Sequence, residues 1–443
     1  MIVTRLSRRW DVPDEFWLLW WRNREHRQLI IDVPVEPASK GPAGKAMAPE
    51  FQRQVMDRME EFGRYPMTGP VALDLHFRAA RRNPPVIYRT VKYTLDLLGA
   101  AVPGSERPRR RNVLYRDDRQ VKFLYADLDQ QWQRKGDDST STGGLWMVAR
   151  RASDVAADLS MAARLHESHL DENDEESPFW VPTIPEDPDL GWPLEPASGR
   201  TPVEQYLADV TRFHHVADVQ EAMLAGTDAT LIWALGSYFD DRSGGGPAEL
   251  ASILAESRAA IRNLLLLEPL TLPLPSLPQV PGQSAAFTRM IRASLEEFRE
   301  RVPLFQSLLV PVTLTFLVVP PEQGKDLDNI ALTVLPIAHD VLRPHIAPHL
   351  LSPTFGDEEQ GPERAEALAR LRSVNALSVR AYQVIELPRS PQGPPEGTLH
   401  LALGPHVHES WWRRASAYLG KAIDLADERH QLADFTWKSI FTG

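Results

Sequence analysis

The stretch Pro311-Val312-Thr313-Leu314-Thr315-Phe316-Leu317-Val318 is a short run of mostly apolar and β-branched residues that ends shortly before a Pro-Pro break. Such a run predicts a buried strand. It parallels Pro70-Val71-Ala72-Leu73-Asp74-Leu75-His76-Phe77 at a constant offset of 241 residues. Because an element order that recurs at a fixed spacing is the signature of an internal repeat, the two stretches predict two copies of one structural unit.

The elements around these two stretches recur in the same order. We expect the first copy to contain strands at 29–35, 71–77, 119–128 and 144–150 and helices at 51–62 and 88–98. We expect the second copy to contain strands at 270–275, 311–318, 382–387 and 397–403, with a helix at 287–298 and another after residue 328. In this alignment Gln383 corresponds to Gln120, because each precedes a valine in its strand.

The predicted fold class is α+β, with two α/β units in tandem at residues 28–152 and 267–405 that form a pseudo-dimer. A largely helical connector at 153–266 separates them, with helical spacing at 203–223 and 248–266 and an acidic, proline-rich segment at 171–196. An aromatic and basic lead-in occupies 1–27, and a C-terminal helix lies within 406–443. The connector and the tail are expected to offer surfaces to a protein partner.

Composition excludes several classes of protein. The chain has no cysteine, so disulfides, thiolate metal sites and cysteine nucleophiles are excluded. It lacks the glycine-rich nucleotide-binding motifs and the G-x-S-x-G motif of serine hydrolases. No apolar run approaches the roughly 20 residues that span a bilayer, so we expect no membrane partner and a cytoplasmic location.

Charge is unevenly distributed along the chain. The formal net charge is −11, yet residues 1–135 carry 25 Lys and Arg against 17 Asp and Glu, a surplus of 8. This third of the chain is expected to face a polyanion, although a solvated arginine surface is the alternative. The candidate contact residues are Arg81, Arg82, Arg107, Arg109, Arg110, Arg111, Arg116 and Arg119.

An acidic stretch, Lys325-Asp326-Leu327-Asp328-Asn329, follows the second copy's buried strand. Two carboxylates two residues apart can converge on one divalent cation, and Mg²⁺ is held by few protein carboxylates beside phosphate. The alternative is that these residues cap the helix that follows, because Asp and Asn side chains accept the unpaired N–H groups of a first turn.

Two short motifs resemble those of the RusA-type Holliday junction resolvases, which are small dimeric Mg²⁺-dependent endonucleases that cut branched DNA. The stretch Asp117-Asp118-Arg119-Gln120-Val121 resembles the D-D-x-Q-V motif of that family, and Asp326-Leu327-Asp328-Asn329 resembles its D-x-D-N motif. The resemblance spans both repeats, about three-fifths of the chain. It implies a RusA-like fold for each unit, branched DNA as the partner, and possible Mg²⁺ dependence.

Neither copy carries the whole set of residues that the resemblance implies. The first copy has Lys92 at the lysine position, Asp96 one turn later and Asp117 and Asp118, but the D-x-D positions fall on Val86 and Tyr88. The second copy has Asp326 and Asp328, but Leu332 stands at the lysine position. The implied catalytic residues are Asp326, Asp328, Asp118 and Lys92, and the implied metal ligands are Asp326, Asp328, Asp117 and Asp118.

These residues predict a branched-DNA-binding protein that resembles a Mg²⁺-dependent structure-selective endonuclease with split or degenerate acidic sites. Asp326 and Asp328 could hold one ion with Glu386 or Asp340 as a third ligand. If the two copies pack as a pseudo-dimer, their acids could instead share one composite site. The alternative is a catalytically inactive scaffold or DNA-binding subunit of a larger complex. The pairs His406/His408 and His214/His215 are expected to be core or solvated histidines.

Overall fold

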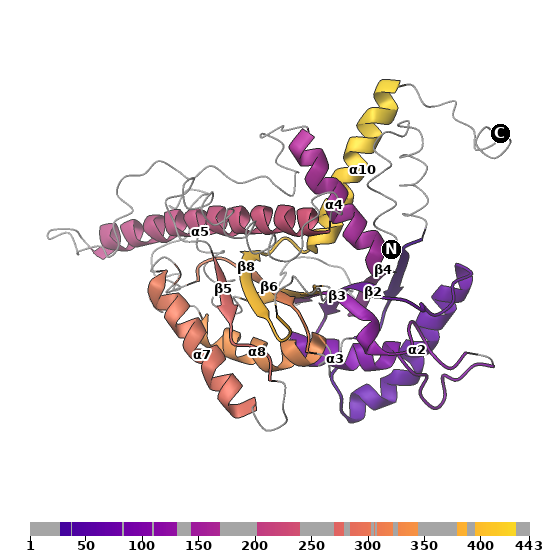
Figure 1. Ribbon diagram of the computed structural model, residues 1–443. Coiled ribbons are helices and arrows are strands. Elements are labelled where there is room, and N and C mark those ends of the chain that lie inside the picture. Colours follow the sequence, from indigo (N-terminus) through magenta and orange to yellow (C-terminus); the bar gives the residue numbers. More distant parts are fainter. Residues whose placement is uncertain are drawn as a thin grey trace.

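The protein is described here from a computed structural model. The described residues are 27–36, 38–81, 84–108, 110–130, 143–168, 202–239, 270–278, 284–302, 305, 308–321, 327–343, 379–387 and 395–430. They form one eight-stranded mixed sheet with helices on both faces (Figure 1). The predicted mixture of helices and strands is therefore confirmed. None of the helices in these residues is both long enough and apolar enough to cross a bilayer.

The sheet contains four strands from each half of the chain. Across the sheet the order is β1 (Leu29–Val33), β4 (Gly144–Arg151), β2 (Val71–Ala79), β3 (Val121–Gln130), β7 (Val379–Glu386), β6 (Val312–Val318), β8 (Leu399–Pro405) and β5 (Thr271–Leu274). The pairs β2–β3 and β6–β7 are parallel, and the others are antiparallel. The central antiparallel pair, β3–β7, joins the two halves; we call it the seam.

The strand registers of the two halves agree. Asp74 of β2 lies opposite Tyr125 of β3, and 241 residues later Thr315 of β6 lies opposite Gln383 of β7. Both parallel pairs also shift register after their first residue, at Val71 and at Val312. The offset between the two paired stretches inferred from sequence therefore holds in the strand pairing.

The predicted correspondence of Gln383 with Gln120 is wrong. Val121 pairs with Val71, whereas Val379 pairs with Val312, so Val379 holds the position of Val121. The sequence alignment used the Gln-Val dipeptide that the two strands share, and this dipeptide lies five residues further along β7 than the register requires. An odd shift of this kind places side chains on the opposite face of the sheet.

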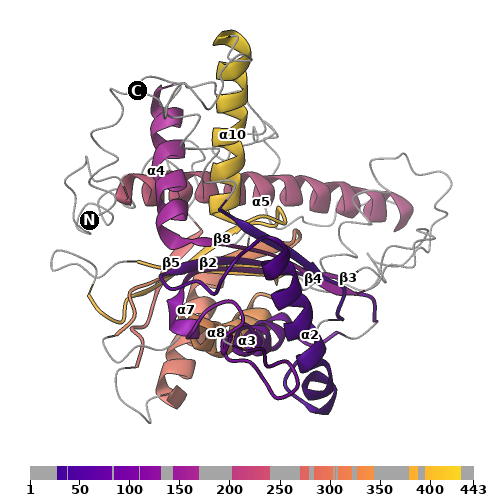
Figure 2. The same ribbon diagram turned by 90° about the vertical axis from the view of Figure 1, so that its right-hand side faces the viewer.

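Helices cover the sheet in two layers (Figures 1 and 2). One layer consists of α2 (Pro42–Glu61), α3 (Ile87–Leu98), α7 (Ser284–Arg301) and α8 (Leu327–Val341). The other consists of α4 (Ala152–Ser168), α5 (Pro202–Tyr238) and α10 (Trp411–His430). Alternate side chains of β2 pack against the two layers. Leu73, Leu75 and Phe77 belong to the core on the α3 side of the sheet, and Ala72 belongs to the core on the α4 side.

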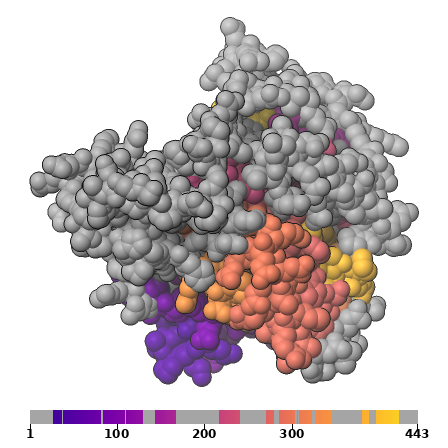
Figure 3. Space-filling view, turned by 90° about the vertical axis from the view of Figure 1, so that its left-hand side faces the viewer, coloured from indigo at the N-terminus to yellow at the C-terminus, as the bar shows by residue number. Residues whose placement is uncertain are grey.

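The layers also connect the two halves. On one face α3 contacts α8, where the rings of Tyr88 and His339 have centroids 6.3 Å apart. On the other face α4 and α10 lie side by side. Figure 3 shows the first-half surface (indigo) next to that of α7 and α8 (salmon and orange). The predicted helix at 248–266, the acidic segment and the lead-in 1–26 lie outside the described residues.

Candidate nucleic-acid interface and acidic site

The D-D-x-Q-V motif forms a self-capped loop at the start of β3. Asp117 accepts a hydrogen bond from the Arg119 N–H through Oδ1 at 3.0 Å, ahead of the single 3₁₀ turn Asp118–Gln120. Gln120 Oε1 in turn accepts from the N–H groups of Asp117 (3.2 Å) and Arg116 (2.9 Å). The Arg119 N–H lowers the pKa of Asp117. The Asp117 carboxylate therefore shapes the loop, as a helix cap does.

The same loop is fastened to the segment that follows α2. Gln120 Nε2 donates to the carbonyls of Met67 (3.1 Å) and Gly69 (2.9 Å), and the Met67 N–H donates to Leu114 O at 2.7 Å. These bonds use the backbone groups of two irregular segments that would otherwise need water. The glutamine of the motif is thus a structural clamp.

Lys92 and Asp118, two residues that the family resemblance singled out, lie close together. The Lys92 ammonium on α3 lies 3.5 Å from Asp118 Oδ2 and 3.5 Å from Asp96 Oδ1, one helical turn away. All three side chains are partly exposed, so the ion pairs are screened by solvent. We call Lys92, Asp96 and Asp118 the acidic site. Its lysine can donate to a phosphate, while its carboxylates repel one.

The acidic site by itself does not fit a magnesium ion. Asp117 uses its carboxylate in the cap, and the Lys92 ammonium lies beside both Asp96 and Asp118. Within the part of the chain that the structure describes, no three His, Asp or Glu side chains are arranged to hold a metal. Asp326 lies outside the described residues, and Asp328 is described only as a backbone position in the first turn of α8.

The two side chains considered as third ligands have other partners. Glu386 at the end of β7 pairs with Lys122 of β3 at 2.6 Å, across the seam. Asp340 pairs with Arg292 at 2.8 Å, which lowers its pKa. Asp340 also lies twelve residues beyond Asp328 in the same helix, about 18 Å along its axis. The expectation that Asp340 joins the D-x-D pair is therefore wrong.

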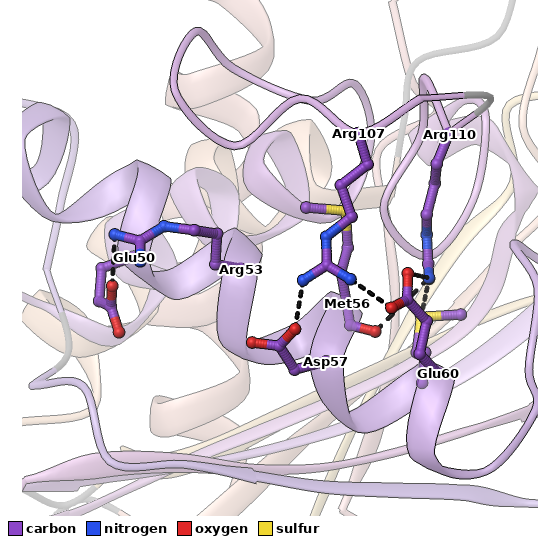
Figure 4. Close-up of polar contacts among 8 residues, drawn as sticks. Glu50, Arg53, Met56, Asp57, Glu60, Arg107 and Arg110 are labelled. Atoms are coloured by element: carbon purple, nitrogen blue, oxygen red, sulfur yellow. Dashed lines mark hydrogen bonds and ion pairs between the residues drawn. The ribbon is translucent and has the colours of Figure 1, made fainter.

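Two of the candidate arginines hold the basic loop onto α2 (Figure 4). The Arg107 guanidinium pairs with Asp57 and Glu60, and the first of these bonds raises its pKa most. Arg110 pairs with Glu60 at 3.2 Å and donates to Val113 O at 3.3 Å. Its side chain is only 9% exposed, and burial lowers its pKa. Both arginines are engaged with the protein's own acids.

The remaining candidate arginines divide into two groups. Arg111, Arg116 and Arg119 are exposed on the loop that leads into β3. Arg81 is exposed near Glu36, with 3.5 Å between the charged groups. Arg82 and Arg109 lie outside the described residues. Exposed Arg89 is a further cation that sequence reasoning missed. It could have been found, because Arg89, Lys92 and Asp96 recur at helical spacing on the outer face of α3.

A second polar cluster lies on the opposite face of the sheet. Asp127 of β3 is contacted by His76 Nδ1 at 3.0 Å and by His408 Nδ1 at 3.2 Å. Burial alone would raise the pKa of Asp127, but hydrogen bonds from the two histidines outweigh it and lower the pKa. Burial disfavours the charged form of His406 and lowers its pKa to about 3, and the nearby His408 lowers it further. Of the predicted pair, His408 thus contacts a carboxylate from the first half, and the ring of His406 packs on His408 with centroids 4.1 Å apart.

Beside this cluster, Asp74 of β2 is fully buried, and burial raises its pKa to about 6 despite the nearby charges of His76 and Arg413. The side chains of His214 and His215 lie outside the described residues.

No protein family, curated protein or solved structure matches this chain. What the candidate sites do is therefore inferred from their own residues.

Proposed function

We propose that the chain is a tandem pseudo-dimer of two RusA-like units that binds branched DNA. The observation that carries the proposal is the agreement of strand order and register between the two halves, which meet in one antiparallel seam. This is the arrangement expected if a dimer of small units became one chain. The D-D-x-Q-V loop and the Lys92 to Asp118 contact support the RusA-like assignment of the first unit.

The proposed DNA-contacting surface consists of the exposed cations around the acidic site. Arg111, Arg116 and Arg119 supply charge from the loop, and Arg89 and Lys92 supply it from α3. Phosphate contacts by such residues provide most of the sequence-independent affinity of DNA-binding proteins and need no metal. Arg107 and Arg110 contribute indirectly, by fixing the loop that presents the others.

The proposed activity is binding, with Mg²⁺-dependent cleavage as the second candidate. Cleavage is favoured only by the D-x-D-N stretch, because Asp326 and Asp328 retain carboxylates that the first unit lacks at Val86 and Tyr88. A hydrolytic metal site needs several converging acids. The described residues supply no such set.

Binding is tested with a labelled four-way junction, a fork and a linear duplex of equal length, titrated with the full chain at three salt concentrations. We expect the junction to bind tightest and the double variant R116A/R119A to bind it about tenfold more weakly, with a smaller salt slope. The matched control is R292A, which removes an exposed arginine of α7. Equal affinity of R116A/R119A and wild type would contradict the proposed surface.

The same junction, incubated with the wild type in Mg²⁺ and in Mn²⁺, tests the second candidate. Cleavage that is lost in D326N and D328N would establish the nuclease. Stable binding with an uncut junction in both metals would establish the non-cleaving protein.

A further inference from the structure

Two aromatic side chains stand out on the surface after α2. Phe62 is 62% exposed and Tyr65 is 85% exposed, and they are the two most exposed large hydrophobic side chains of the described residues. Leaving two rings in water forgoes the stabilisation that their burial would give. They lie three positions apart in one turn, with Arg64 between them.

The backbone holds this turn in a defined shape. The Arg64 N–H donates to Met59 O at 2.7 Å, and the Gly63 N–H donates to Glu60 O at 2.9 Å. With Gly63 at φ 61°, this is the Schellman pattern that ends many helices, and its left-handed position favours glycine. Phe62 and Tyr65 are thus presented on a fixed helix end.

This helix end is tied to the acidic site. The segment continues from Tyr65 to Met67 and Gly69, whose carbonyls are held by the Gln120 side chain. Gln120 closes the loop that carries Asp118, the partner of Lys92. The segment that carries the two rings and the loop that carries the proposed phosphate contacts are therefore held together by hydrogen bonds.

Among the described residues that follow α7, no exposed aromatic pair matches Phe62 and Tyr65. After α7 the chain places Val302 and Phe305 in the core, at 5% and 1% exposure. The exposed aromatic turn therefore occurs once in the described part of the chain. The two halves differ in this feature although their strand registers agree.

We propose that Phe62 and Tyr65 form a stacking platform for bases at the branch point of the DNA, where the stacking of the duplex is interrupted. The inference rests on the proposed function and adds a recognition element to it. Aromatic side chains stack on nucleobases of any sequence, and a braced basic surface keeps the backbone beside them. Branch points offer bases that are already partly unstacked, so the energy needed to expose them is small. Linear duplex offers none.

The test uses the full-length chain with a four-way junction that carries 2-aminopurine at the branch point, whose fluorescence reports stacking. The variant F62A/Y65A is expected to bind the junction about tenfold more weakly and to lose the change in fluorescence. Binding to linear duplex should change less than twofold. The control M290A removes an exposed apolar side chain from α7 in the other half. In an F62A background, Y65W should restore the change in 2-aminopurine fluorescence.

The outcomes separate the two proposals. Unchanged junction affinity and fluorescence in F62A/Y65A, with weaker binding by R116A/R119A, would overturn the stacking platform and leave the proposed function standing. A wild type that binds no DNA would overturn both. Thermal melting of each variant excludes misfolding, since exposed side chains on an intact turn should leave the melting temperature within about 2 °C.

Discussion

Tyr125 and Gln383 lie opposite one another in the β3–β7 seam. They are equivalent positions of the two halves, because Tyr125 pairs with Asp74 and Gln383 pairs with Thr315. The pairing on either side of this residue pair is symmetric, because Phe123 lies opposite Ile385 and Asp127 lies opposite Ala381. The two side chains differ in chemistry. Gln383 Nε2 donates to Thr315 Oγ1 at 2.7 Å, and its Oε1 accepts from the Trp411 N–H at 3.3 Å. Tyr125 Oη contacts Asp127 at 3.4 Å.

The first prediction concerns this residue pair. Q383L should lower the free energy of unfolding by about 2 kcal/mol, because it leaves a buried hydroxyl and a buried N–H without their partner. Y125F should cost less than about 1 kcal/mol, because the contact that it removes is long. Urea unfolding measures both. An equal loss in the two variants would contradict the assigned roles.

The second prediction concerns Arg110, whose guanidinium is almost buried against Glu60 and Val113 O. R110A should cost about 2 kcal/mol of stability, because it removes a largely buried side chain and leaves the carbonyl of Val113 without this donor. R111A, which removes the exposed neighbour, should change stability by less than about 0.5 kcal/mol. The opposite ranking would show that the loop is not held through Arg110.

The third prediction uses the pKa of Asp74, which burial raises to about 6. Between its unfolded value near 3.8 and about 6, the folded protein keeps a proton that the unfolded chain releases, so stability falls as pH rises through this window. D74N should therefore be more stable than wild type above pH 6, by up to about 3 kcal/mol, and should match it near pH 4.

D158N is the control for that experiment. Asp158 is also buried but pairs with Arg150, so its loss should destabilise the fold at neutral pH. Unfolding curves at pH 4, 5, 6 and 7.5 give the comparison. A D74N stability difference that does not vary with pH would contradict the raised pKa.

The fourth prediction concerns His339, whose pKa burial lowers to about 4 and whose Nε2 has no hydrogen-bond partner in the described part of the chain. The folded state keeps this histidine neutral, whereas the unfolded chain takes up a proton below about pH 6.5. The free energy of unfolding therefore decreases as the pH falls from about 6.5 towards 4. H339F should lessen the acid destabilisation of wild type, with up to about 3 kcal/mol less loss between pH 6.5 and 4. Identical pH profiles would refute it.

The fifth prediction separates the charges of the acidic site. K92M should weaken junction binding about threefold to tenfold, because it removes a phosphate contact. D118N should strengthen binding in the absence of divalent metal, because it removes a charge that repels phosphate. Fluorescence anisotropy in EDTA measures both variants. Weaker binding by D118N in EDTA would show that Asp118 acts mainly by positioning Lys92.

Sequence reasoning found what local patterns encode. The strands at 71–77 and 311–318 and the helix at 88–98 were predicted, because apolar periodicity specifies them. The register of β7 was missed, because the Gln-Val dipeptide that β7 shares with Gln120-Val121 gave a false alignment. The strand is buried on both faces, so no regular alternation of apolar and polar residues corrects that alignment.

Partner choice by side chains was also missed. The engagement of Arg107 with Asp57 and Glu60 depends on a contact between residues about 50 positions apart, which no local pattern shows. The cap formed by Asp117 was visible in principle, since an Asp three residues before a Gln is a recognised N-terminal signal. The adjacent carboxylates of Asp117 and Asp118 favoured the interpretation as metal ligands instead.

The seam has a practical consequence for anyone who divides this protein. Cutting the chain between its halves would strip β3 of the partner that pairs with Phe123 to Asp127, and would leave a strand of largely apolar residues with unpaired backbone groups at the margin of the fragment. An unpaired edge strand of this kind pairs readily with other chains, so we expect an isolated half to self-associate through β3 or to precipitate. We therefore expect both halves to be needed in one chain for a well-behaved protein.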